Sequence, residues 1–430
     1  MKIPNLRWFI IALIGVATLI NFIDRSALTI MWPFIYQDFN ISHEDSKSTL
    51  AMITSCFLVA YALGQTAFGK IMDAIGTRFG MVISIVLWSI SIALHSLAKS
   101  IVSFNIFRFM LGFSEAGNWP GATKSNAEWF PAKERAIAQG IFGAGASLGS
   151  VVSAPIIAAL FLAFGWKMTF FLIAGLGFLW IIPWLLINKA TPEKHPWITD
   201  KERAHILEIA EPNETVKVVK AYSWTQLLKF RDTWGIIGAR FFIDPVWWLF
   251  ITWLPTFLND HFAFNIKEIG AFSWLPFTLA ALGGILGGYH SSYQIKRGKV
   301  AHTARKRSIT LGSVIMLLSL TGLALFLNTF KAYPYFAMIL IGGTLFGFQF
   351  LISNLQTLPS DYFHGKNIGT VAGMGGTAAV LGTILTTLAV PYLTRTSYIS
   401  FFVLAAILVP IAWCCIWFIH SKKKAVHHEF

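Results

Sequence analysis

Apolar residues fill long runs of this chain, and short polar segments separate most of these runs. An α-helix needs about 20 apolar residues to cross the hydrocarbon core of a bilayer. Twelve runs reach that length, at residues 8–32, 49–70, 79–98, 101–124, 136–163, 167–188, 233–258, 268–292, 307–329, 333–357, 367–394 and 397–420. The pattern therefore predicts an all-α polytopic membrane protein with twelve transmembrane helices.

One polar stretch, residues 189–232, is much longer than the others and separates six runs from six. It predicts three parts of the chain. They are an N-terminal six-helix bundle at 1–188, a cytoplasmic central loop at 189–232, and a C-terminal six-helix bundle with a short tail at 233–430.

The central loop contains one signal for a helix. Thr199 and Glu202 have the spacing of a capping box, in which the threonine caps the helix and the glutamate reaches back to it. We expect a short amphipathic helix that runs through Ile209 on the inner surface of the membrane.

Composition and charge agree with a membrane protein. Hydrophobic residues make up 55% of the 430 residues and charged residues only 13%, whereas soluble domains average about 25% charged residues. The net charge is +14, but its basic residues are spread between the runs, which argues against a nucleic-acid partner. The first run carries charges and lacks a small-residue cleavage site, so we expect it to stay as the first helix.

The basic residues also predict the orientation. Lys2, Arg7, Arg78 and the block 296–307 fall on one side of the predicted helices, and the opposite loops hold few basic residues. The positive-inside rule then places both termini in the cytoplasm. With compact loops, this topology favours a multi-pass protein of the cytoplasmic (inner) membrane of a bacterium.

The sequence gives no sign of a metal site, an organic cofactor or an enzyme. Cys56, Cys414 and Cys415 lie in apolar runs without the spacing of metal ligands. Neither the nucleotide-binding pattern GxxxxGK[ST] nor the zinc pattern HExxH occurs. We expect no catalysis and no use of ATP within this chain, and a proton gradient as its source of energy.

The loop after the second run reads GKIMDAIGTRFG, and it resembles the loop signature of the major facilitator superfamily. The matching positions are Gly69, Asp73, Gly76 and Arg78. Asp73 at a helix N-terminus could bond Arg78 and form a latch that opens during transport. The alternative is a static turn.

A degraded second copy of this loop, GYHSSYQIKRG, follows the eighth run at residues 288–298. Ser292 takes the place of Asp73 in this copy. A weak repeat at half-chain spacing implies two bundles with a substrate site between them.

Four charged residues form a candidate cluster in the first and fourth predicted membrane helices. Asp24 and Arg25 belong to the first run, and Arg108 and Glu115 lie seven residues apart on one face of the fourth. Unpaired charges are costly in lipid, so we expect these four to form a neutral cluster. It is either a structural salt-bridge network, or a site where Arg25 binds a substrate carboxylate while Asp24 and Glu115 exchange protons.

The seventh run carries Arg240 and Asp244 at a spacing that permits a pair within the helix, directly before Pro245. We interpret them either as a structural pair beside a gating kink or as lining of a substrate site. Trp248 could stack on a sugar ring, although tryptophan is also common at lipid interfaces.

Uncharged polar residues supply further candidates for substrate contact. Gln349, Ser353 and Asn354 lie deep in the tenth run and suit the hydroxyl groups of a polar substrate. The alternative is hydrogen bonding between helices. Tyr61 in the second run is another candidate.

The whole chain resembles the anion:cation symporters of the major facilitator superfamily. This group includes bacterial hexuronate and galactonate transporters and the vertebrate sialin and vesicular glutamate carriers. The resemblance rests on the segments NFIDRSAL, RFMLGFSEAGNWPGATKSNAEWFPAKERAIAQGIF, DPVWWLFITWLP and SNLQTLPSD. It looks most similar to the hexuronate branch, which implies import of glucuronate or galacturonate with protons by alternating access.

The resemblance also implies roles for single residues. Arg25 would contact the substrate carboxylate, Asp24 and Glu115 would be proton sites, and Arg108 would modulate them. Tyr61 and Asn354 fall where relatives have substrate-facing groups.

Three departures from the family pattern keep a second substrate class open. Phe22 replaces a common tyrosine, Gly143 and Ala146 stand where relatives often carry polar residues, and Phe348 replaces a polar residue. Each loses a hydroxyl contact, which favours an aromatic or less hydroxylated carboxylate.

We expect the partners to be a small organic anion, protons and the lipid bilayer, and the protein to be a monomer. An exporter or facilitator remains open, with transport that ignores Glu115 as its sign. A transport-inactive sensor is less favoured, because only residues 421–430 follow the last run.

Overall fold

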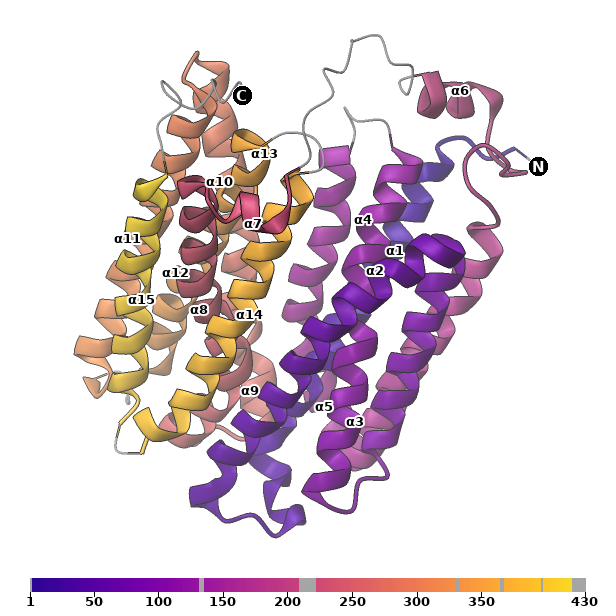
Figure 1. The fold of residues 1–430 in the computed structure, drawn as a ribbon. Helices are drawn as coiled ribbons and strands as arrows, with labels where there is room; N and C mark the ends of the chain where they lie inside the picture. The colour runs from indigo at the N-terminus through magenta and orange to yellow at the C-terminus, as the bar shows by residue number, and fades with distance from the viewer. Residues whose placement is uncertain are drawn as a thin grey trace. The chain divides into compact units, whose positions relative to one another are not determined.

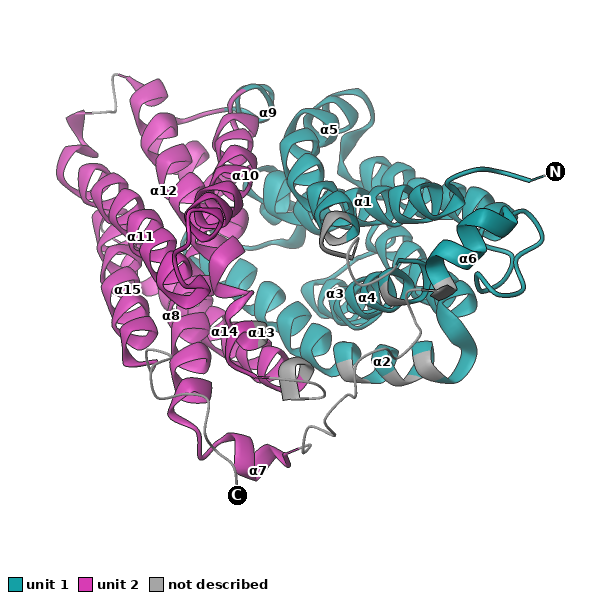
Figure 2. Ribbon diagram, turned by 90° about the horizontal axis from the view of Figure 1, so that it is seen from above, with its two compact units in different colours: residues 1–215, 265–271 teal, residues 216–264, 272–430 magenta. Residues whose placement is uncertain are grey.

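The computed structural model describes residues 2–130, 135–208, 222–329, 333–363, 367–395 and 397–419, and these form α-helices with short connections (Figure 1). Within these ranges, ten helices are long and apolar enough to cross a membrane. The chain divides into two compact units (Figure 2). Unit 1 comprises Met1–Thr215 and Asn265–Ala271, and unit 2 comprises Val216–Phe264 and Phe272–Phe430.

Unit 1 contains the helices of the first six predicted runs, a short 3-10 helix and the helix predicted in the central loop. They are α1 (Leu6–Ile35), the 3-10 helix η1 (Tyr36–Phe39), α2 (His43–His95), α3 (Ile101–Glu115), α4 (Asn118–Trp129), α5 (Arg135–Ile187) and α6 (Asp200–Glu208), and α9 (Ile266–Phe272) packs with this unit. Two of the helices are broken at a glycine with positive φ, which is 79° at Gly76 in α2 and 73° at Gly165 in α5. Only glycine takes this conformation without strain. Each of α2 and α5 therefore consists of two helices on either side of a glycine, and these correspond to two predicted runs.

Unit 2 contains the helices of the second half. They are α7 (Trp224–Leu227), α8 (Arg231–Phe262), α10 (Trp274–Lys296), α11 (Ala301–Phe326), α12 (Pro334–Leu355), α13 (Leu358–Tyr362), α14 (Asn367–Leu393) and α15 (Ile399–Phe418). The prediction of an all-α polytopic membrane fold is confirmed. The count of twelve spans and the cytoplasmic placement of both termini stay predictions.

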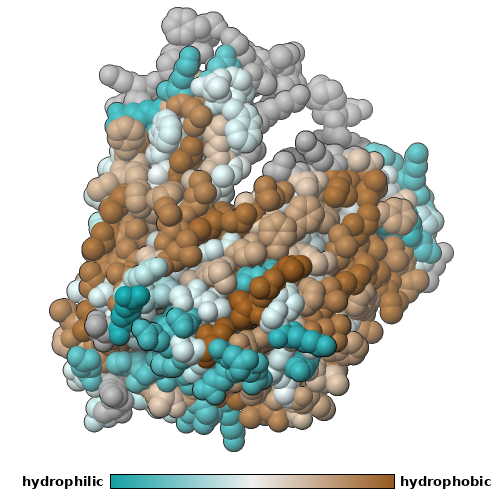
Figure 3. Space-filling model, turned by 60° about the horizontal axis from the view of Figure 1, so that its bottom comes forward, coloured by the Kyte–Doolittle hydropathy of each residue, from teal (hydrophilic) through white to brown (hydrophobic). Residues whose placement is uncertain are grey.

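The outer surfaces of the helices are apolar. Leu179, Ile182 and Leu186 lie about one and two turns apart along α5 and are all exposed. Figure 3 shows hydrophobic side chains over broad areas of the surface, with hydrophilic ones gathered in patches. Exposed apolar area of this extent is expected of a surface that faces lipid.

Glycines allow very close helix packing inside each unit. A Cβ atom at Gly64 would lie 2.2 Å from the carbonyl oxygen of Phe113, and one at Gly112 would lie 2.3 Å from that of Phe57, so α2 and α3 touch backbone to backbone. A Cβ atom at Gly287 of α10 would likewise lie 2.3 Å from the carbonyl oxygen of Phe350 of α12. Such contacts replace the hydrophobic effect as the source of helix association in lipid.

The residues after α5 are bound to unit 1. His195 is buried against Trp129, donates from Nε2 to the carbonyl oxygen of Ile187 (2.8 Å) and accepts the Trp197 N–H at Nδ1 (3.2 Å). Burial lowers the pKa of His195, so its neutral ring keeps Nδ1 available as an acceptor.

The predicted capping box at α6 forms only in part. Thr199 Oγ1 accepts the N–H of Glu202 (3.2 Å), but the Glu202 carboxylate does not reach back to Thr199. It accepts the N–H groups of Leu6 (3.0 Å) and Arg7 (3.2 Å) and pairs with Arg7 Nη1 (2.8 Å), so it caps α1. Glu202 turns to α1 because the first N–H groups of that helix have no acceptor within the helix itself. The predicted helix end at Ile209 lies outside the described residues.

The cap on α1 gives a prediction about stability. Glu202→Ala leaves two backbone N–H groups and a buried guanidinium without their acceptor, and breaking a buried ion pair costs about 3–5 kcal/mol. We expect a clear fall in the melting temperature of the purified protein. The control is Asp200→Asn, which removes the exposed partner of Lys2 and Arg203 and should change the melting temperature little. Equal falls in the two variants would contradict the capping role.

Candidate functional site

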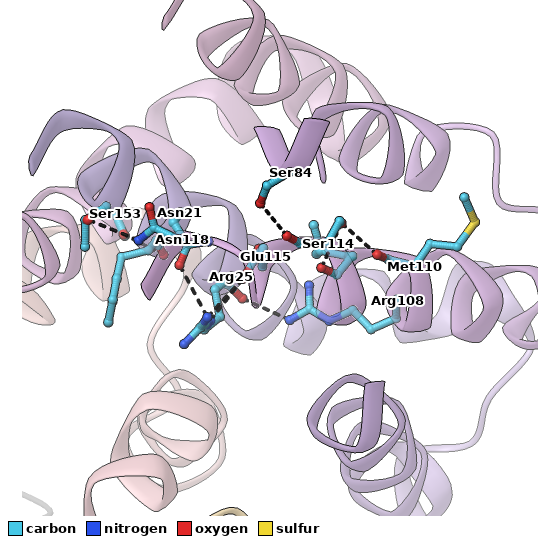
Figure 4. Close-up of polar contacts among 12 residues, drawn as sticks. Asn21, Arg25, Ser84, Arg108, Met110, Ser114, Glu115, Asn118 and Ser153 are labelled. Carbon is cyan, nitrogen blue, oxygen red and sulfur yellow. Dashed lines mark hydrogen bonds and ion pairs between the residues drawn. The ribbon is translucent and has the colours of Figure 1, made fainter. Parts of the chain in front are cut away.

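A buried ion pair joins α1 to the end of α3 in unit 1 (Figure 4). Arg25 donates to Glu115 Oε2 from Nη2 (3.0 Å) and from Nε (3.2 Å). Its Nη2 also donates to Oδ1 of Asn21 (3.3 Å), one turn earlier on α1. Arg25 is only 5% exposed and Glu115 is 0% exposed, so the pair is shielded from solvent.

The other two charges of the predicted cluster lie near this pair but do not complete it. Arg108 Nη2 donates to the backbone carbonyl oxygen of Arg25 (3.0 Å). Asp24 is 0% exposed, and neither of its carboxylate oxygens has a hydrogen-bond partner among the described residues. The structure thus brings all four charges into one region, but it pairs only Arg25 with Glu115.

Aromatic rings surround the Arg25 guanidinium. Its Cζ lies 5.3 Å from the ring centroid of Phe22, 5.2 Å from that of Phe57 and 5.0 Å from that of Tyr61. Tyr61 therefore lies beside Arg25. The sequence reasoning did not single out Asn21 or Phe57, although each lies one helical turn before a candidate, Arg25 and Tyr61 respectively.

The loop between the two parts of α2 binds the end of α5. Arg78 Nη1 donates to the carbonyl oxygen of Lys189 (2.6 Å), and Nη2 donates to that of Leu185 (3.3 Å). A cation at a helix C-terminus meets the negative end of the helix dipole. Trp184 Nε1 donates back to the Arg78 carbonyl oxygen (2.9 Å).

Two other residues of the loop signature lie in this region. Gly69 is within α2 and Gly76 forms its break. The side chain of Asp73 lies outside the described residues, so its predicted bond to Arg78 stays a prediction.

In unit 2, Arg240 and Asp244 form the predicted pair within α8, with 2.5 Å between Nε and Oδ2. The stem of Arg240 packs on α14, where a Cβ at Gly375 would lie 3.3 Å from its Cγ. Trp248 follows one turn later and is half-buried.

The polar residues of α12 have different environments. Asn354 is fully buried, donates from Nδ2 to the carbonyl oxygens of Gly287 (3.0 Å) and Phe350 (2.9 Å), and accepts from Arg305 Nη1 (3.3 Å) at Oδ1. These bonds match the alternative of hydrogen bonding between helices. Ser353 donates to the Phe350 carbonyl oxygen (3.1 Å), and Gln349 is half-buried.

Arg305 is a residue of this region that the sequence reasoning did not select. It donates to Ser291 Oγ (2.7 Å), and its Nε lies 3.6 Å from Oδ2 of Asp361. The sequence held a signal for this pair. Residues 269–360 contain no Asp or Glu, so Asp361 is the first acidic residue after the basic block at 296–307 that could pair with Arg305.

Comparison with known proteins agrees with this architecture. The model of the family described as Major Facilitator Superfamily matches residues 14–387. The hexuronate transporter of Escherichia coli (strain K12) is 34% identical over 429 residues, which cover 99% of this chain and 96% of that protein. The galacturonate transporter of Dickeya chrysanthemi is 33% identical over 317 residues, or 74% of this chain and 90% of that protein.

Among solved structures, a bacterial homologue of the human lysosomal transporter Spinster has a similar fold, with a TM-score of 0.74 at 17% identity. The match covers 97% of this chain and 99% of that chain. The resemblance found in the sequence is therefore confirmed. This chain is a multi-pass membrane protein that belongs to the major facilitator superfamily, a family of transporters.

Proposed function

We propose that this protein is a proton-coupled symporter of the bacterial cytoplasmic membrane that imports a hexuronate, such as glucuronate or galacturonate, by alternating access. The observation that carries the proposal is the buried pair of Arg25 and Glu115. The two relatives, a hexuronate transporter and a galacturonate transporter, support the substrate class.

The pair suggests how an acid would be bound. A guanidinium binds a carboxylate through two parallel hydrogen bonds, and Glu115 now occupies part of that fork. A substrate carboxylate can replace Glu115 at Arg25 if the bond between the two residues weakens. Uptake of a proton by Glu115 weakens it, because a neutral carboxyl group is no longer attracted to the guanidinium as an anion is.

Charge balance then couples the anion to the proton. With Glu115 protonated and the substrate absent, the buried Arg25 cation would lose the negative charge of its carboxylate partner, which is costly. The substrate carboxylate restores neutrality, so each event favours the other. Such mutual dependence is a coupling free energy between two ligands.

Asp24 and Arg108 extend this scheme. An ionised carboxylate without hydrogen bonds is expensive to bury, which makes Asp24 a second candidate for carrying a proton. Arg108 lies next to Arg25 and holds its backbone carbonyl, so it is suited to modulate both carboxylates.

The remaining candidates are assigned by the position and burial of their side chains. In unit 1, we assign Tyr61 to the substrate site because it lies at the Arg25 guanidinium. In unit 2, Trp248, Gln349 and Ser353 are only partly buried and suit contacts with sugar hydroxyl groups. Asn354 would have to give up its bonds to Gly287 and Arg305 to do the same.

The loop signature and the pair in α8 belong to gating in this proposal. Arg78 and Asp73 would act at the inner face, together with Gly69 and Gly76. Arg240 and Asp244 would act beside Pro245, where the sequence predicts a kink. The energy source is the proton gradient, and no cofactor is required.

A second candidate substrate is an acid with fewer hydroxyl groups. Phe22 and Phe57 face Arg25 with apolar rings, and neither can bond a sugar hydroxyl. This surrounding suits an aromatic or more apolar carboxylate.

Uptake into proteoliposomes tests the proposal. We expect labelled glucuronate or galacturonate to enter when an inward proton gradient is imposed, and unlabelled hexuronates to block the uptake. A panel of aromatic and short aliphatic acids serves as competitors. Block by those acids and not by hexuronates would favour the second candidate. Uptake that is equal with and without the gradient would contradict proton coupling.

Glu115→Gln tests the proton site. The amide keeps the shape of the side chain but takes up no proton, so gradient-driven accumulation should be lost while counterflow of substrate persists. The control is Glu44→Gln in the exposed first turn of α2, which should accumulate substrate like the wild type. Accumulation by Glu115→Gln at the wild-type level would remove Glu115 from coupling and support a facilitator.

Arg25→Lys tests the substrate carboxylate site. Lysine keeps the charge but loses the planar fork, so the affinity for the acid should fall by about tenfold or more. Equilibrium binding to the detergent-purified protein measures this, with the melting temperature as a check on folding. Unchanged affinity would mean that another residue holds the carboxylate.

A further inference from the structure

Phe57 on α2 faces two buried cations at once. The centre of its ring lies 5.2 Å from Cζ of Arg25 on α1 and 4.9 Å from Cζ of Arg108 on α3. The side chain is only 1% exposed. A cation within about 6 Å of a ring centroid is attracted to the negative face of the ring, and burial strengthens this attraction.

The close packing of α2 and α3 places this ring. Gly112 lies one turn after Arg108 on α3, and a Cβ at that position would meet the carbonyl oxygen of Phe57 at 2.3 Å. Only glycine permits the two backbones to come so close. The helix that carries Phe57 is thereby held against the helix that carries Arg108 and Glu115.

The ring matters most for Arg108, because the described ion pair of the cluster joins Arg25, and not Arg108, to Glu115. Arg108 donates one hydrogen bond to a carbonyl oxygen, and its Nε and Nη1 have no acceptor among the described residues. For Arg108, the face of Phe57 supplies attraction that no carboxylate supplies through a direct contact.

We propose that Phe57 is a positioning residue of the transport site, a shared aromatic platform that holds Arg25 and Arg108 in place while Arg25 exchanges Glu115 for the substrate carboxylate. This inference rests on the proposed function. A ring attracts a cation whether or not an anion is present, so the platform acts before, during and after the exchange. Phe57 itself binds no proton and forms no bond to the substrate.

Two positions on the same helix allow a matched test. Phe68 on α2 is also fully buried, and its described ring contact is with Phe113 (5.8 Å) and not with a cation. Phenylalanines with one, two or three ring fluorines are introduced at position 57 or at position 68 of the full chain. Fluorine withdraws charge from the face of the ring and changes its size little, so a cation contact weakens step by step.

Two quantities are measured on each purified protein. The first is the melting temperature without substrate, which we expect to fall with each fluorine at position 57 and to change much less at position 68. The second is the affinity for glucuronate, which we expect to fall by about tenfold for the trifluorinated ring at 57. A companion pair of variants checks the aromatic requirement: Phe57→Trp should retain binding, and Phe57→Leu should lose it.

Each result decides one part of the inference. Equal melting series at 57 and 68 overturn the platform, whether or not glucuronate binds. A steeper series at 57 with unchanged glucuronate affinity overturns the positioning role. Wild-type protein that is folded but does not bind glucuronate overturns the proposed substrate, while the melting series still tests the platform.

Discussion

The cost of holding charge inside lipid is the constraint on which unit 1 depends. Arg25 and Glu115 are both buried, and they can remain so only because α1 and the end of α3 bring them within hydrogen-bond distance. Asn21 and the surrounding rings hold the guanidinium in that position. In the proposed function, the same constraint makes the pair responsive, because a substrate carboxylate would compensate for the loss of charge on Glu115.

The two units solve a similar packing problem with different chemistry. In each, glycines let neighbouring helices meet backbone to backbone, and a second helix begins within a few residues of the first, α4 after α3 and α13 after α12. Near that point unit 1 has the carboxylate of Glu115, whereas unit 2 has the amide of Asn354. An amide does not change its charge by taking up a proton at physiological pH, whereas a carboxylate can. Both proton sites of the proposed function, Asp24 and Glu115, lie in unit 1.

Much of the fold could be predicted from hydropathy, because lipid selects the apolar runs directly. Helix ends could not, since α11 begins at Ala301 within the basic block and α2 begins at His43, before its apolar run. The sequence could predict that the four buried charges lie close together, because the free energy of an unpaired charge in lipid is high. Their pairing was not predictable. Asp24 has no hydrogen-bond partner among the described residues, although the sequence predicts a neutral cluster. The place of Phe57 depends on the close contact of α2 and α3 at Gly112.

The cap that Glu202 places on α1 links two events that are far apart in protein synthesis. The first helix leaves the ribosome long before residue 202, and until then its N-terminal amides must be satisfied by water or lipid head groups. The N-terminal bundle therefore reaches its final form only after the chain has passed α6. A fragment that stops at residue 188 would contain six apolar runs and still lack the group that completes the first one.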